Sequence, residues 1–244
     1  MPWVLGGCGC LTLIAIIAGI LIFLAYRAKQ KVTEFKSDFK SALKSVDDTS
    51  KALVDPRSVT TTTPRPGWQT YTNVKENLPS SLQSNFVAFS FEYPKSFSIQ
   101  PQSDVNFVKV EKYAAGGKGK TAENFAVGYA WFDPPTVQSD ALYDKLLDRL
   151  SQQIASDLYN YKELKRTPIT VDGVQSRAAL FQAGFKNAPN ILIYGKAIIV
   201  HPSEKRNGVT IIILSTSMSR DIKSPDDLGT KGDMADILQS FHFH

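Results

Sequence analysis

The pattern of apolar and polar residues begins with a segment that carries no charge. Residues 1–26 contain no charged side chain, and residues 11–26 are almost wholly aliphatic. A helix of about 20 apolar residues spans a hydrocarbon core of ~30 Å. The pattern therefore predicts a transmembrane anchor over residues 1–27. Charges begin abruptly at Arg27, Lys29 and Lys31, which predicts contact with anionic lipid headgroups.

Two other interpretations of this segment fit less well. A removable signal peptide has a basic start and a small-residue cleavage site, and neither flanks this apolar run. Residues 5–8 look like a lipobox, but they precede the apolar run, so we do not expect lipidation of Cys8 by that route. Palmitoylation of Cys8 or Cys10 at the membrane edge stays open. We expect the segment to be retained as an anchor.

Apolar residues then recur every three and four positions over residues 28–55. The seam consists of Val32, Phe35, Phe39, Ala42, Val46, Thr49 and Leu53. Three heptads of this kind predict an amphipathic stalk helix that ends near Asp55, because Pro56 disfavours a helical residue before it. The stalk either pairs with a helix of the same or another protein, or packs on its own domain or the membrane surface.

Residues 56–84 are rich in Thr and Pro and predict an extended linker without a core. Residues 85–244 predict a domain of strands and two helices. We expect strands over residues 86–93, 97–100, 106–113, 125–132, 162–171, 175–185, 190–201 and 208–216. The first two form a hairpin in this interpretation.

The turn and strand patterns of the domain predict its sheet. Asp172-Gly173 and Asn207-Gly208 are typical hairpin dipeptides. Residues 191–194 and 209–214 are apolar on both faces, which predicts central strands covered by helices on either side.

A helix is expected over residues 139–159, with Ser139 as its N-cap. Its apolar stripe is directed at the sheet. The stripe consists of Leu142, Leu146, Leu150, Ile154 and Leu158, joined by Leu147 and Ala155. The run Ser224-Pro225-Asp226-Asp227 predicts the start of a last helix. The fold class is therefore α+β, an antiparallel sheet sandwiched by helices, preceded by one transmembrane helix and an amphipathic stalk.

The distribution of charge along the chain excludes some classes of function. The chain has 244 residues and a formal net charge of +5, of which residues 1–84 carry +4 and residues 85–244 carry +1. A nucleic-acid-binding domain would carry its own basic patch, so no nucleic-acid partner is expected. Both cysteines lie in the anchor, so the domain has no disulfide and no thiolate metal site. The basic flank places the domain in the cytoplasm by the positive-inside rule.

Candidate chemistry in the domain is sparse. Residues 114–121 fit a relaxed Walker A pattern, but strands are expected on both sides, so we interpret them as a hairpin loop. His242 and His244 are weak metal candidates, with a frayed terminus as the ordinary explanation. No histidine lies in a nucleophile or metal motif, so we expect no catalytic residues and no cofactor.

Two further groups have structural interpretations. Lys162, Lys165 and Arg166 are interpreted as a solvated strand end. The aromatic residues Tyr129, Trp131 and Phe132 are interpreted as core and sheet-face residues.

Three segments of the domain resemble a known family. They are residues 89–97 (FSFEYPKSF), 171–178 (VDGVQSRA) and 237–241 (ILQSF). Together with the order of elements, they resemble the PsbP-like family of extrinsic photosystem proteins and their bacterial relatives. That fold is shared with a small Ran-binding protein of nuclear transport. The resemblance covers residues 85–244 and none of the anchor.

The resemblance implies a non-enzymatic accessory or assembly subunit of a larger membrane complex, photosynthetic or electron-transferring. A single-pass protein of the bacterial cytoplasmic membrane is expected, with the domain outside the cytoplasm by resemblance and inside by the charge rule. Expected partners are the bilayer, through residues 1–27, and another membrane protein or complex. The alternative function is a membrane-tethered domain that binds or senses a ligand or lipid.

Overall fold

The computed structural model describes residues 65–100, 106–114, 121–132, 139–185, 188–202 and 206–244. The predicted anchor and stalk lie outside these residues. The same is true of the predicted contact residues Arg27, Lys29, Lys31, Val32, Phe35, Phe39, Val46 and Leu53. Within the described part of the chain, no helix is long and apolar enough to cross a membrane.

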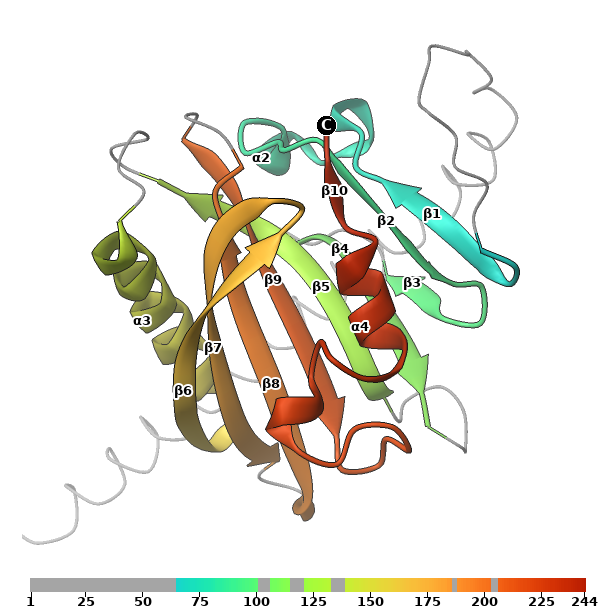
Figure 1. Ribbon diagram of the computed structural model, residues 1–244, viewed down its shortest axis with the longest axis vertical. Helices are drawn as coiled ribbons and strands as arrows, with labels where there is room; N and C mark the ends of the chain where they lie inside the picture. The colour runs from blue at the N-terminus through green and yellow to red at the C-terminus, as the bar shows by residue number, and fades with distance from the viewer. Residues whose placement is uncertain (1–64, 101–105, 115–120, 133–138, 186–187, 203–205) are drawn as a thin grey trace, which may run out of the picture. The chain divides into compact units, whose positions relative to one another are not determined.

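A seven-stranded antiparallel sheet forms the centre of the domain (Figure 1). Its strand order is β3-β4-β5-β9-β8-β7-β6, so β9 is the middle strand and β8 its neighbour, as their two-sided apolar patterns predict. The bounds are Ser98–Gln100 for β3, Asn106–Tyr113 for β4, Thr121–Trp131 for β5, Tyr159–Val171 for β6, Val174–Phe185 for β7, Ala188–Val200 for β8 and Asn207–Thr216 for β9.

The two faces of this sheet are covered differently. The helix α3, Asp140–Asp157, packs over β6, β7 and β8 on one face. The other face carries α4, Gly232–Gln239, and a second sheet of three strands in the order β1-β2-β10. Those strands are Trp68–Thr72, Phe89–Pro94 and His242–Phe243. The α+β class is confirmed, but one of the two covering layers is partly a sheet rather than helices alone.

The larger core lies under α4 and the three-stranded sheet and is built from aromatic rings. The ring centroids of Phe89 and Phe241 are 5.1 Å apart, and those of Phe91 and Phe125 are 5.2 Å apart. Phe107 completes the buried group. Such ring pairs contribute about 0.5–1.5 kcal/mol each beyond their buried area. This cluster joins β2 to the last residues of the domain.

Two sequence expectations about the start of the domain are wrong. The strands β2 and β3 do not form a hairpin, since β2 pairs with β1 and β10 whereas β3 pairs with β4. The predicted linker of residues 56–84 is also shorter than expected. Its second half contains β1, a 3-10 helix at Lys75–Asn77 and the helix α2, Ser80–Gln83. Leu78 and Leu82 in this half are buried in the larger core, which holds it on the domain.

The two predicted hairpin dipeptides have different outcomes. Asp172 and Gly173 have φ angles of +48° and +76° and form the turn between β6 and β7, as predicted. Asn207 and Gly208 instead lie within β9. A Cβ on Gly208 would lie 2.4 Å from the ring of Phe132, so this position is glycine because a side chain has no room.

The helix predicted from Ser224 is interrupted. A 3-10 turn covers Pro225–Asp227, and α4 begins only at Gly232. Gly229 and Gly232 have φ angles of +71° and +67°, which are incompatible with a continuous α-helix. The N-cap of α3 is confirmed, because the Ser139 hydroxyl accepts a hydrogen bond from the backbone N–H of Leu142 at 3.3 Å.

Asp227 stabilises the segment before α4 through contacts of its side chain. Its Oδ1 lies 2.7 Å from the Lys231 ammonium, and its Oδ2 accepts backbone N–H groups of Lys223 at 2.9 Å and Ser224 at 3.0 Å. These contacts, the Lys231 bond above all, lower the pKa of Asp227 to about 2.

The pH dependence of stability should therefore change in Asp227→Asn. An unfolded aspartate has a pKa of about 3.9. Because the folded value is lower, the stabilisation is complete above that pH and is lost as the pH falls toward 2. Urea unfolding at pH 6, 4 and 2.5 should show a steeper loss of stability in the wild type than in Asp227→Asn. The exposed neighbour variant Asp226→Asn should keep the wild-type slope; equal slopes in all three proteins would contradict the assignment.

Gly195 of β8 allows a close approach between the sheet and the ring of Phe181. A Cβ at this position would lie 1.9 to 2.4 Å from three ring carbons of Phe181. Phe181 is fully buried and its ring centroid lies 5.1 Å from that of Tyr161, so the ring has little room to move.

Gly195→Ala should lower the free energy of unfolding by about 1–3 kcal/mol or more, because it overpacks this site. Gly184→Ala is the matched control on the neighbouring strand, since the nearest atoms to its Cβ are backbone oxygens at 3.8 Å. Urea unfolding followed by circular dichroism measures both. Equal stability of the two variants would show that the ring accommodates the methyl group.

Candidate functional site

Ion pairs fix the position of α3 on the sheet. The Arg166 guanidinium of β6 lies 2.6 Å from Asp148 Oδ1 and 2.7 Å from Glu163 Oε1, and it donates to the Asp144 carbonyl at 3.0 Å. Arg177 of β7 binds Asp144 at 3.0 Å. The hydrogen bonds from Arg166 lower the pKa of Glu163. The basic cluster at Lys162, Lys165 and Arg166 is thus not simply a solvated strand end, because Arg166 ties α3 to β6.

The apolar face of α3 predicted from the sequence packs on the sheet. Its buried residues are Tyr143, Leu147 and Ser151. The predicted leucine stripe is half-buried and packs against the core that Ala179, Phe181, Ala197 and Ile199 form. One side of this face, formed by Leu146, Leu150 and Ile154, borders the part of the sheet that α3 does not cover.

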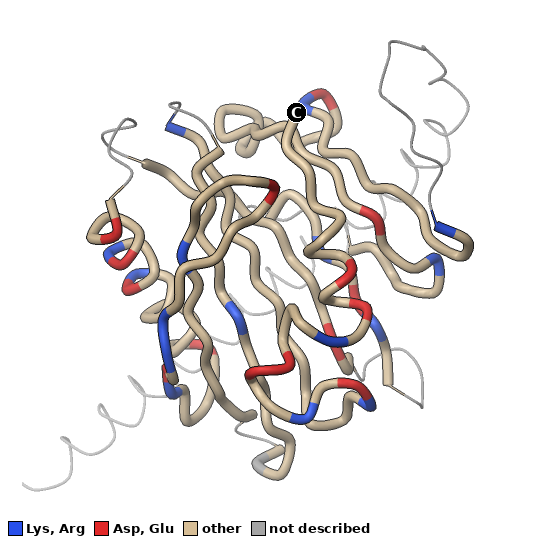
Figure 2. The backbone as a smooth tube through the Cα atoms, viewed as in Figure 1, with Lys and Arg blue, Asp and Glu red and all other residues tan. Residues whose placement is uncertain are grey.

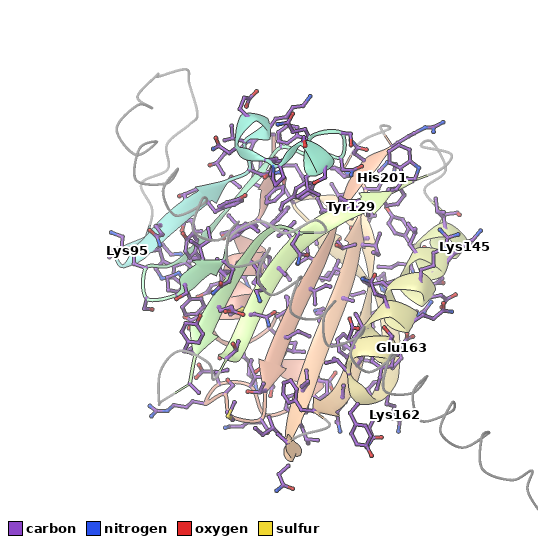
Figure 3. The ribbon with its side chains drawn as sticks, turned by 180° about the vertical axis from the view of Figure 1, so that it is seen from behind. Lys95, Tyr129, Lys145, Lys162, Glu163 and His201 are labelled. Atoms are coloured by element: carbon purple, nitrogen blue, oxygen red, sulfur yellow. The ribbon has the colours of Figure 1, made fainter. Side chains whose placement is uncertain are left out.

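The sheet face beside Leu146, Leu150 and Ile154 has no described helix over it. In Figure 3, α3 lies over one side of this face, while β5 and β9 carry no described helix on the same face. Ile212 of β9 lies opposite Ala197 of β8 on one side and Ala126 of β5 on the other, so these three side chains share the face that carries α3.

A groove of about 380 Å³ runs between α3 and this face. We call it the α3 groove. Its helix wall is formed by Leu146, Leu150 and Ile154, and its floor includes Thr210 and Ile212. Because α3 contributes residues from positions 146 to 157, the groove extends about 16 Å along the helix.

The rim of the α3 groove is polar and aromatic. Arg149 and Asp157 are exposed on the helix side. Trp131 closes the strand side and is 47% exposed, with the Arg206 guanidinium 5.7 Å from its ring centre. Phe132 and Tyr129 pack against the cores, as interpreted, and Trp131 lies on β5 as a half-exposed residue of the sheet.

The two terminal histidines are ordered parts of the sheet rather than a frayed end. His242 and Phe243 form β10 beside β2. His242 Nδ1 lies 2.9 Å from Asp172 Oδ1, and Asp172 Oδ2 accepts the Phe243 backbone N–H at 2.8 Å. His244 Nε2 lies 2.9 Å from Ser90 Oγ. These contacts explain the histidines structurally. Within the described residues, no group of three or more His, Cys, Asp or Glu side chains is arranged to hold a metal ion.

The Walker-like segment has the flanks that a hairpin requires. The strands β4 and β5 on either side pair antiparallel, whereas a phosphate-binding loop needs a helix after it. Residues 115–120 of the segment lie outside the described residues. No phosphate-binding helix follows it, because the chain enters β5 at Thr121.

The α3 groove was missed at the level of sequence. The apolar face of α3 was predictable, but the part of the sheet that it leaves uncovered was not. That part depends on the strand order and on the ion pairs of Arg166 and Arg177, whose partners are distant in sequence.

No family model and no curated protein matches the chain. Among solved structures, it is similar to cyanobacterial PsbP (CyanoP) from Synechocystis sp. PCC 6803, at 12% identity and a TM-score of 0.48, over 78% of this chain and 100% of that chain. It is also similar to the Ran-binding protein Mog1p from Saccharomyces cerevisiae, at 12% identity and a TM-score of 0.41, over 64% of this chain and 89% of that chain. A protein of unknown function from Pseudomonas aeruginosa matches at 14% identity and a TM-score of 0.31, over 58% and 81%.

These similarities concern the fold alone, because the identities are 12% to 14% and every TM-score is below 0.5. Nothing about activity or partners is carried from these proteins to this chain. What the PsbP-like resemblance implies about function stays a prediction.

Proposed function

We propose that this protein is a non-catalytic accessory or assembly subunit of a larger membrane complex, and that the α3 groove receives an amphipathic helix of a partner chain. One observation supports this above all. A half-exposed apolar stripe of α3 faces a part of the sheet that no described helix covers.

The geometry favours a helix as the occupant. Helices pack side by side at 8–10 Å, and α3 occupies only the β6, β7 and β8 half of its layer. A second helix beside α3 would contact Leu146, Leu150 and Ile154 with one side and the Ile212 floor with the other. A groove of about 16 Å matches three turns of helix. The rim charges Arg149 and Asp157, of opposite sign, would orient an occupant with complementary ends.

The membrane part of the proposal rests on the sequence. Residues 1–27 would hold the domain at the bilayer, with Arg27, Lys29 and Lys31 at the headgroups. The stalk residues Val32, Phe35, Phe39, Val46 and Leu53 would add a helix-pairing surface. The proposal that the complex is photosynthetic or electron-transferring rests on the PsbP-like resemblance alone.

Photo-crosslinking in native membranes tests the groove. Gln153 lines the α3 groove, whereas its neighbour Gln152 is exposed and does not. A benzophenone amino acid at position 153 should crosslink one partner stoichiometrically, and the same group at position 152 should give little of that product. Equal crosslinking from both positions would show that the groove is not the contact surface.

Charge substitution in the groove gives an independent prediction. Leu150→Lys and Ile212→Lys should each reduce co-purification of that partner in mild detergent at least tenfold, because they place an unpaired charge in an apolar contact. Leu164→Lys is the matched control, since Leu164 is 43% exposed on β6 and does not line the groove. Thermal melting of each variant separates loss of the contact from loss of folding, because Leu150 also packs against the core under α3. A wild-type protein that purifies as a clean monomer contradicts the proposed function.

A ligand-binding function is the second candidate. A volume of about 380 Å³ with apolar walls and the polar residues Asn106 and Arg149 lies in the range of small-molecule sites. Mass spectrometry of extracts from purified protein distinguishes the two. A lipid or pigment retained by the wild type and lost from Ile212→Lys would favour a ligand over a helix.

A further inference from the structure

A second pocket, of about 290 Å³, lies where the end of β4 and the start of β5 meet the segment after β9. We call it the Glu123 pocket. Figure 2 shows acidic and basic positions intermixed where this segment and the start of α4 approach β4 and β5. The charged side chains on its wall are Lys112, Glu123, Arg220 and Asp221.

Lys112 is held by three carboxylates. Its Nζ lies 2.9 Å from Asp233, 3.1 Å from Asp221 and 3.3 Å from Glu123 Oε1. Burial by itself would lower the pKa of Lys112, but the hydrogen bonds to Asp233 and Asp221 raise it overall. The Lys112 ammonium donates hydrogen bonds to Asp233 and Asp221 and forms an ion pair with Glu123 Oε1, so its charge is balanced within the group.

Glu123 is the buried member of this group and is 1% exposed. Its position follows from the alternation of β5, because Phe125 and Val127 point to the same core. Oε1 accepts a hydrogen bond from the Ser219 hydroxyl at 2.9 Å, and that hydroxyl also accepts the Asp221 backbone N–H. Oε2 is buried and has no hydrogen-bond partner in the part of the chain that the structure describes.

A buried carboxylate oxygen without a donor is unfavourable, so it marks a place for a donor from outside. We propose that the Glu123 pocket binds a guanidinium group, which donates to Glu123 Oε2. A guanidinium presents several N–H groups in one plane and remains cationic at any physiological pH. Asp221, whose side chain is 48% exposed, offers a second acceptor at the mouth.

The other walls suit the stem of an arginine-like molecule. Met218 and Tyr113 line the pocket beside the charged residues. A methylene chain packs on a thioether, and a guanidinium stacks on an aromatic ring. A metal ion fits the site poorly, because the Lys112 ammonium already occupies the space between the three carboxylates. No described group of His, Cys, Asp and Glu residues at this pocket or elsewhere is arranged for a metal.

The guanidinium has two possible sources with the same chemistry, an arginine side chain of a protein or a free guanidinium metabolite. Calorimetric titration of the full chain in mild detergent with N-acetylarginine methylamide represents the first, and titration with agmatine represents the second. Both probes should bind saturably, and the probe that binds more tightly identifies the source of the guanidinium. The citrulline analogue is neutral and nearly isosteric, so it should bind at least tenfold more weakly.

Two variants locate the binding and establish the sign of the ligand charge. Glu123→Gln removes the carboxylate and should weaken binding about tenfold or more. Arg220→Ala removes an exposed cation from the mouth and should strengthen binding of a cation severalfold without affecting the fold. Ile212→Lys alters only the α3 groove and should bind the guanidinium probes like the wild type.

Three results would overturn the proposal. Absence of binding by both guanidinium probes would mean that water alone satisfies Glu123 Oε2. Equal binding of the citrulline analogue would mean that charge is not recognised. Weaker binding by Arg220→Ala would mean that the pocket prefers an anion, and this variant decides the question even if Glu123→Gln fails to fold.

Discussion

A seven-stranded sheet has two apolar faces, and in this domain they are covered to different extents. The face under α4 and the three-stranded sheet is sealed by the aromatic group of Phe89, Phe91 and Phe241, which joins the two ends of the domain. The opposite face has only α3, set over β6, β7 and β8. The remaining half of that face is where the α3 groove lies, so the main candidate site is a consequence of how the layers are filled.

The ion pairs of Arg166 and Arg177 determine which part of this face α3 covers. Without them, an amphipathic helix with a broad apolar face could lie at several positions on a broad sheet. Arg166 and Arg177 bind Asp140, Asp144 and Asp148 from the side remote from the groove. They hold α3 toward the β6 edge of the sheet. Leu146, Leu150 and Ile154 are thereby left beside the part of the sheet that α3 does not cover.

Features that depend only on neighbouring residues could be predicted from the sequence. The Ser139 cap and the Asp172-Gly173 turn depend on residues within a few positions, and both were predictable. The separation of β2 from β3 was not, because β2 pairs with β10 from the far end of the chain. The same holds for the sites. Glu123 stands at an inward position in the alternation of β5, which is visible in the sequence, but its partner Ser219 comes from a segment almost a hundred residues later.

The two pockets lie on one strand and yet are physically separate. Glu123 and Ala130 are both in β5, seven positions apart, so they point to opposite faces and lie about 23 Å apart along the strand. The stretch of β5 between the two pockets is paired with β4 on one side and with β9 on the other. This described part of the sheet contains no helix or loop that would move. A rigid strand transmits little change from one face to the other, so each pocket should bind its ligand independently. A domain built this way can contact two components at once, and a substitution in one pocket leaves the other intact.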